Sequence, residues 1–178
     1  MADQITFDLN GFSELYKKFK DINDKAKNEV KSEFNASALK IQNDAKKMAP
    51  VNFGNLRNLI VLTEDGDTKN FSYTVGARAS YSPYVEFGTG GKVSVPNNYQ
   101  EYASKFKGNG GGTFKEMIEA LTLWVRRKGI GGKNDKSTAY LIARSILKNG
   151  LKPQPFLIPA FEQEKPKLLK RIKEILNA

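Results

Sequence analysis

The chain has 178 residues, no cysteine and no histidine, and it carries 29 Lys and Arg against 19 Asp and Glu. Without cysteine, neither disulfide bonds nor thiolate metal sites can form, and without histidine the commonest general base and metal ligand is missing. The length suits one domain with a hydrophobic core, and no apolar run approaches the roughly 18–20 residues of a membrane span. We therefore expect a single domain over residues 1–178, with no enzymatic activity, no cofactor and no membrane contact.

The positive charge is concentrated in the last third of the chain. Residues 113–178 hold 14 Lys and Arg against 6 Asp and Glu, whereas residues 1–112 are nearly balanced. A basic segment of this kind is attracted to polyanions, such as nucleic acid or an acidic protein face. Solvated helix faces account for much of the excess, so contact with nucleic acid remains one alternative.

The first half of the chain predicts a helix followed by a small sheet. Ile5–Leu9 alternates apolar and polar residues, which indicates a short strand, and Asn10 is a plausible N-cap for the next element. Ile60–Thr63 and Phe71–Val75 predict an antiparallel hairpin with one buried face. A long amphipathic helix, ended by Pro50, is predicted by apolar residues at steps of three or four: Phe12, Leu15, Phe19, Ile22, Ala26, Val30, Phe34, Ala38, Ile41, Ala45 and Met48.

The stretch Tyr81–Gly91 is the most informative part of the sequence. Pro83 turns the chain, and one helical turn can follow before Gly88 ends it. Glu86 is then held between two apolar residues, in surroundings unusual for a surface carboxylate. Three interpretations stay open: a packed corner in which Glu86 caps backbone amides or pairs with a cation such as Arg57, a subunit-contact corner, or a catalytic carboxylate.

The second half predicts a loop and three helices. Residues 88–112 are rich in glycine and indicate a flexible loop, and the Gly-Lys-Ser/Thr ending of a nucleotide loop is absent. Thr113–Glu116 is a capping box, so one helix begins there and ends at Gly129, and a second is expected from about Ser137 to Lys148. Pro153–Pro159 is expected to be extended, as a candidate edge strand.

The closing helix is expected to turn one apolar stripe toward the fold and its charges outward. The stripe comprises Phe161, Leu168, Leu169, Ile172, Ile175 and Leu176, and the cations expected outside it are Lys167, Lys170, Arg171 and Lys173.

Three motifs together resemble a known family. Residues 49–60, Ala-Pro-Val-Asn-Phe-Gly-Asn-Leu-Arg-Asn-Leu-Ile, are similar to an Ala-Pro-Val-Asp-Thr-Gly-x-Leu-Arg-x-Ser-Ile block. Residues 84–89, Tyr-Val-Glu-Phe-Gly-Thr, resemble a Tyr-x-Glu-Phe-Gly-Thr block, and residues 153–160 end in the Pro-Phe-Leu-x-Pro-Ala block that precedes a last helix. In this order they are typical of the neck or tail-completion family of long-tailed double-stranded DNA bacteriophages. Asn52 and Phe53 depart from that family's Asp-Thr.

The resemblance implies an α+β fold, in which a small antiparallel sheet is packed by a long N-terminal helix and a C-terminal helix. Residues 92–150 would be a helical, Gly-rich insertion. It also implies a non-enzymatic virion protein at the head–tail junction, assembled in the host cytoplasm, where copies form a ring around the path of the genomic double-stranded DNA. Its other partners would be head-completion, tail-terminator and tail proteins.

The candidate contact residues follow from these interpretations. Those expected to touch another subunit are Arg57, Tyr84, Glu86, Phe87 and Thr89. Those expected to face DNA or a partner are Lys167, Lys170, Arg171 and Lys173.

Two alternatives remain open. A basic nucleic-acid-binding accessory protein would use the last third of the chain, with Tyr99, Tyr102, Phe106 and Trp124 as stacking residues. An enzyme would use Glu86 with Arg57 or Lys92, although carboxylate–arginine pairs are usually structural.

Overall fold

The computed structural model describes residues 5–8, 24–51, 55–66, 71–79, 81–104 and 113–177. The described chain is α+β, as expected, and it divides into two compact units. One unit, the sheet unit, comprises the described residues within 2–79 and 155–178, and the other, the helical unit, comprises those within 80–154. In the described parts, no helix is both long enough and apolar enough to cross a membrane.

The sheet unit contains three antiparallel strands, β1 (Ile5–Asp8), β2 (Ile60–Gly66) and β3 (Phe71–Ala77), in the order β1-β3-β2. The expected hairpin is confirmed: Leu62 pairs with Val75, and Ile60 pairs with Ala77. Both hairpin strands run longer than the apolar alternation indicated. β3 is the central strand, which explains why three of its side chains are almost fully buried: Tyr73, Val75 and Ala77.

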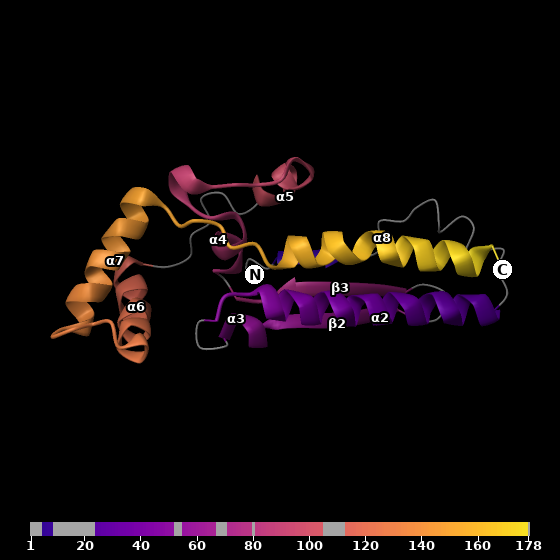
Figure 1. Ribbon diagram of the computed structural model, residues 1–178, viewed down its shortest axis with the longest axis horizontal. Coiled ribbons are helices and arrows are strands. Elements are labelled where there is room, and N and C mark those ends of the chain that lie inside the picture. The colour runs from indigo at the N-terminus through magenta and orange to yellow at the C-terminus, as the bar shows by residue number, and fades with distance from the viewer. Residues whose placement is uncertain are drawn as a thin grey trace. The chain divides into compact units, whose positions relative to one another are not determined.

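Helix α2 (Asp24–Met48) packs against both β2 and β3, and it runs alongside α8 (Leu157–Leu176) in Figure 1. The predicted stripe is confirmed within the described residues, because it contains every buried apolar residue of α2: Val30, Phe34, Ala38, Ile41 and Ala45. Met48 belonged to the predicted stripe but is exposed, since it is the last residue of the helix. Asn10 and the first part of the expected helix lie outside the described residues.

Helix α8 begins within the segment that was expected to be extended. Leu157 is its first residue, so the prediction of an extended segment over Pro153–Pro159 was wrong for its last three residues. The reason is that Pro159 lies in the first helical turn, where a backbone N–H has no partner inside the helix. Three stripe residues, Phe161, Leu168 and Ile172, are buried, whereas Leu169, Ile175 and Leu176 are half-buried.

The helical unit begins with α4 (Ser82–Phe87), followed by short helical segments where a loop was expected. These are the 3₁₀ turns η1 (Gly90–Lys92) and η2 (Asn97–Tyr99) and the helix α5 (Gln100–Ser104). The loop prediction is therefore wrong for most of residues 90–104. Pro96 precedes η2 and accepts a backbone hydrogen bond from Tyr99, so local turns organise this segment despite its low apolar content. Residues 105–112 lie outside the described part.

Two antiparallel helices, α6 (Phe114–Lys128) and α7 (Asp135–Asn149), complete the helical unit and pack against each other. The predicted capping box is confirmed: Thr113 Oγ1 accepts from the Glu116 amide, while the Glu116 carboxylate accepts from the Thr113 amide at 2.6 Å. Gly129 ends α6 in the left-handed conformation, also as predicted. α7 begins two residues earlier than expected because the Asn134 side chain caps it.

Candidate functional site

The second and third motifs meet where the chain enters and leaves the segment that contains α6 and α7. Thr89 and Leu151 are doubly paired, since the Thr89 amide donates to the Leu151 carbonyl at 3.0 Å and the Leu151 amide donates to Thr89 Oγ1 at 2.8 Å. The Gln154 amide adds a third bond, to the Val85 carbonyl at 2.8 Å. We call residues 84–89 with 150–154 the clamp. It holds the two ends of the expected insertion, residues 92–150, close to each other.

Two glycines make this close approach possible. Gly88 has a φ of +79°, and a Cβ atom there would lie 2.7 Å from the Leu151 carbonyl oxygen. Gly150 has a φ of +71°, and a Cβ atom there would overlap the Thr89 carbonyl. Both positions therefore combine a backbone conformation that favours glycine with a lack of room for any side chain. Close backbone packing thus explains Gly88 of the motif, and the hydrogen bond that the Thr89 hydroxyl accepts explains Thr89.

Glu86 lies inside this structure. Only 1 % of the Glu86 surface is exposed to solvent, and Phe87 beside it is also buried. Tyr84 and Thr89 are half-buried. A buried carboxylate is retained where polar partners compensate for its lost hydration. Four of the five predicted contact residues are therefore brought together, and Glu86 belongs to the interior of the described chain.

Arg57 belongs to the sheet unit, and its guanidinium has backbone partners there. Its Nε donates to the Ala49 carbonyl at 3.1 Å and its Nη2 to the Lys47 carbonyl at 3.4 Å. These carbonyls lie at the C-terminal end of α2, where cations are favoured by the helix dipole. Arg57, from the helix α3 (Asn55–Asn58), therefore fastens the first motif to the end of α2.

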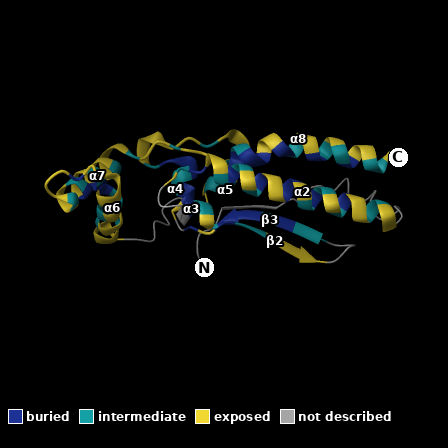
Figure 2. Ribbon diagram, turned by 60° about the horizontal axis from the view of Figure 1, so that its bottom comes forward, coloured by how far each residue is buried: buried dark blue, intermediate teal, exposed yellow. Residues whose placement is uncertain are grey.

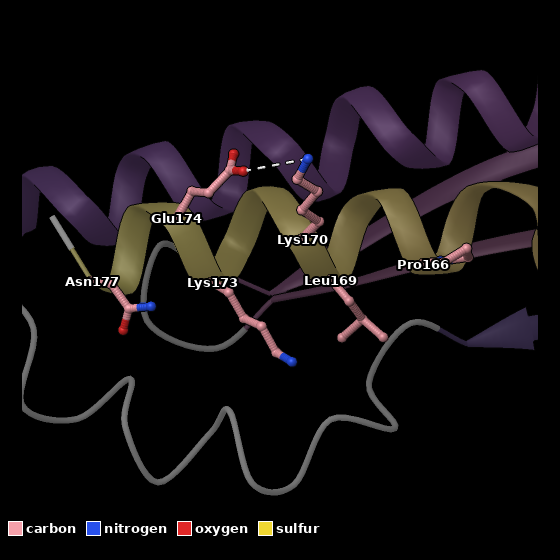
Figure 3. Close-up of a pocket in the computed structure, with 6 residues that line it drawn as sticks. All are labelled: Pro166, Leu169, Lys170, Lys173, Glu174 and Asn177. Carbon is pink, nitrogen blue, oxygen red and sulfur yellow. Dashed lines mark ion pairs between the residues drawn. The ribbon is translucent and has the colours of Figure 1, made fainter.

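Three of the four predicted basic residues, Lys167, Lys170 and Lys173, are exposed on α8. Figure 3 shows Lys170 beside Glu174, at 4.0 Å, while Leu169 and Lys173 project from another side of the helix. Leu169, Lys170 and Lys173 are among the residues that line a pocket of about 550 Å³, together with Pro166, Glu174 and Asn177. This surface combines apolar contacts with cations and is open to solvent.

Arg171 has a different environment from the three lysines. Its Nε donates to Glu33 at 2.6 Å, and its Nη2 donates to Glu164 at 2.7 Å and to Ser37 Oγ at 2.5 Å. The Ser37 hydroxyl also donates to Glu164, at 3.1 Å. The hydrogen bond with Glu164 is the main cause that raises the pKa of Arg171 above its usual value. This four-residue network, which we call the α2–α8 network, ties the two long helices together.

The sequence interpretation missed Glu164, although a signal was present. Glu164 falls between Phe161 and Leu168 on the buried stripe of α8, where a carboxylate requires partners. Arg171 follows it by seven residues, on nearly the same helix face. Only one oxygen of Glu164 has a hydrogen-bond partner in the described structure, while its Oε2 has none.

The residues of the two alternative functions are placed on separate elements. Tyr99 ends η2, Tyr102 lies in α5, and Trp124 is half-buried in α6, while Phe106 is outside the described residues. Lys92 is exposed at the end of η1. Among the described residues, no group of three acidic side chains is arranged to hold a metal ion.

Comparison with known proteins gives one family. Residues 13–88 match the HK97-gp10-like family, described as "Bacteriophage HK97-gp10, putative tail-component". No curated protein and no solved structure matches the chain. The matched segment contains the first motif and residues 84–88 of the second, and it supports the resemblance to phage neck and tail-completion proteins. Over residues 13–88, the chain is therefore similar to the HK97-gp10-like family of bacteriophage tail components.

Proposed function

We propose that this protein is a non-enzymatic virion protein of the head–tail junction. In this role, copies of the chain form a ring around the DNA path and join the tail to the DNA-filled head. The observation that carries the proposal is the match of residues 13–88 to a family of phage tail components. The ring, the junction and the neighbouring head-completion and tail proteins go beyond that match and rest on the ordered trio of motifs.

The clamp and the basic face of α8 suit such a role in different ways. In the clamp, paired backbone groups and two positive-φ glycines define the local backbone closely, which favours a structural role for the second motif. On α8, Lys167, Lys170 and Lys173 are exposed cations on a helix whose other face is buried. Such cations are suited to DNA phosphates or to an acidic neighbour, through contacts that salt weakens.

Electron microscopy of the purified protein, alone and mixed with isolated tails, tests the ring. We expect closed rings with a central opening, either free or at the head-proximal end of tails. The proposal fails if the protein stays monomeric in the presence of tails and if particles made without it carry normal tails.

A complementation assay tests the basic face. In phage that lack this gene, the triple variant Lys167→Gln, Lys170→Gln, Lys173→Gln should fold normally, because exposed charges contribute within about 0.5 kcal/mol each. We expect fewer tailed, DNA-filled particles, and a larger loss as the salt concentration rises. A matched control removes three exposed lysines of α2: Lys25, Lys40 and Lys47. Equal yields from both variants across the salt range would refute a role for the α8 lysines.

A salt titration distinguishes the nucleic-acid-binding alternative. A protein whose main partner is DNA should bind duplex without tails or heads, with an affinity that falls steeply with salt at a defined site size. A ring subunit with only incidental phosphate contacts should bind free duplex weakly.

A further inference from the structure

The α6–α7 hairpin leaves much of its apolar surface uncovered. Among the described residues of these two helices, only Val125, Ala139 and Ala143 are buried apolar side chains. Six of the twelve exposed large apolar side chains in the described chain belong to residues 113–150: Phe114, Leu123, Ile130, Tyr140, Leu141 and Leu147. Figure 2 shows exposed residues along both helices. Such concentrated exposure in a small element indicates a surface that another molecule covers.

Part of this surface is continuous, centred on Arg144. The rings of Phe114 and Tyr140 meet edge-to-face at 5.8 Å, and the Arg144 guanidinium lies 6.0 Å from the centre of the Tyr140 ring. Tyr140, Leu141, Leu147 and Lys148 are three or four residues from Arg144 along α7, so their side chains surround it. Leu141 and Leu147 are each 66 % exposed. We call these six residues the hairpin patch.

The charge around the patch is strongly positive. Residues 113–150 carry 8 Lys and Arg against 3 Asp and Glu. Arg126 is paired with Asp135 at 3.0 Å, which joins the start of α7 to the end of α6. Two further cations, Arg144 and Lys148, belong to the patch itself. The patch therefore favours a ligand that carries both negative charge and apolar side chains.

This chemistry separates the possible occupants. A second hairpin would bring two strongly positive surfaces together, which is unfavourable. Duplex DNA would satisfy the cations, but it would leave Leu141 and Leu147 against phosphates and sugars without an apolar partner. An acidic amphipathic helix satisfies both requirements, because its carboxylates meet the cations while its apolar stripe covers the leucines.

We propose that the hairpin patch is a docking site for an acidic amphipathic helix of another protein. This inference rests on the local structure of α6 and α7, and it holds whether or not the chain forms a ring at the head–tail junction. The patch supplies apolar anchors in Leu141 and Leu147, and it supplies specificity for negative charge in Arg144 and Lys148.

The test uses the full chain and two designed peptides. The first is a helix of about 18 residues with Leu along one stripe and Glu elsewhere, and the second has the same composition in an order that destroys the stripe. We expect the first peptide to bind at least about tenfold more tightly than the second in a fluorescence-anisotropy titration. Leu141→Ser with Leu147→Ser should weaken binding about tenfold, and Arg144→Gln with Lys148→Gln should weaken it and reduce its salt dependence.

Leu39→Ser is the matched control, since Leu39 is 43 % exposed on a helix of the sheet unit. It should leave peptide binding unchanged, and circular dichroism checks that every variant is folded. The proposal is overturned if both peptides bind equally, or if the leucine variant binds as wild type does. A dimer in sedimentation experiments that depends on Leu141 and Leu147 would also overturn it. The same holds if a DNA duplex of about 20 base pairs binds through those leucines more tightly than the first peptide does.

Discussion

Replacing Arg171 by methionine should destabilise the sheet unit far more than replacing one of the exposed lysines near it in α8. The side chain of Glu164 is only 2 % exposed. After the substitution, its carboxylate would keep Ser37 as its one hydrogen-bond partner. Removing one partner of a buried ion pair costs about 3–5 kcal/mol, because the other charge is left uncompensated. Since the Arg171 side chain is 36 % exposed, water can partly replace it, and we expect a loss of about 2–4 kcal/mol in the free energy of unfolding.

The double variant Glu164→Met with Arg171→Met separates an ion-pair effect from a packing effect. With both charges removed, no carboxylate is stranded among apolar side chains, and the double variant should lie within about 1 kcal/mol of wild type. Lys170→Met is the control, because Lys170 is exposed and lies 4.0 Å from the equally exposed Glu174. Its effect should stay within about 0.5 kcal/mol.

Urea denaturation followed by far-UV circular dichroism measures these changes, and hydrogen exchange in α2 and α8 locates them in the sheet unit. The three free energies must be compared at equal denaturant slope. The reasoning is refuted if Arg171→Met unfolds at the same urea concentration as wild type, or if the double variant is as unstable as the single one.

Three further predictions concern the helical unit. Glu86→Ala should lower the free energy of unfolding by about 1–3 kcal/mol, because polar groups that Glu86 satisfies would be left buried, and an unchanged melting temperature would place Glu86 at the surface instead. Gly150→Ala should cost about 2–3 kcal/mol and speed hydrogen exchange at the Thr89 amide, whereas Gly91→Ala, where a Cβ atom meets nothing within 4 Å, should have little effect; equal effects would contradict the clamp. The hydrogen bonds from Thr113 lower the pKa of Glu116 below 4.5, so its stabilisation of α6 is present above pH 4.5 and is lost as the pH falls through the lowered pKa; an NMR titration of Glu116 at its ordinary pKa would refute this.

The elements that depend on near neighbours in the chain were predictable from the sequence. The capping box at Thr113, the stop at Gly129 and the turn ended by Gly88 involve partners within about one helical turn, so the pattern of residue types contains the whole interaction. The stripe of α2 and the alternation in β3 were predictable for a related reason, since each element must bury one face.

The tertiary structure decided where distant segments meet. Nothing local indicates that Thr89 pairs with Leu151, because the two residues are 62 positions apart and their approach depends on glycines at 88 and 150. Arg171 lies beside three exposed lysines in the sequence, yet it pairs with Glu33, 138 positions away, because α8 packs against α2 at that point. A residue's type limits its possible partners, and only the packing of the helices determines which partner is within reach.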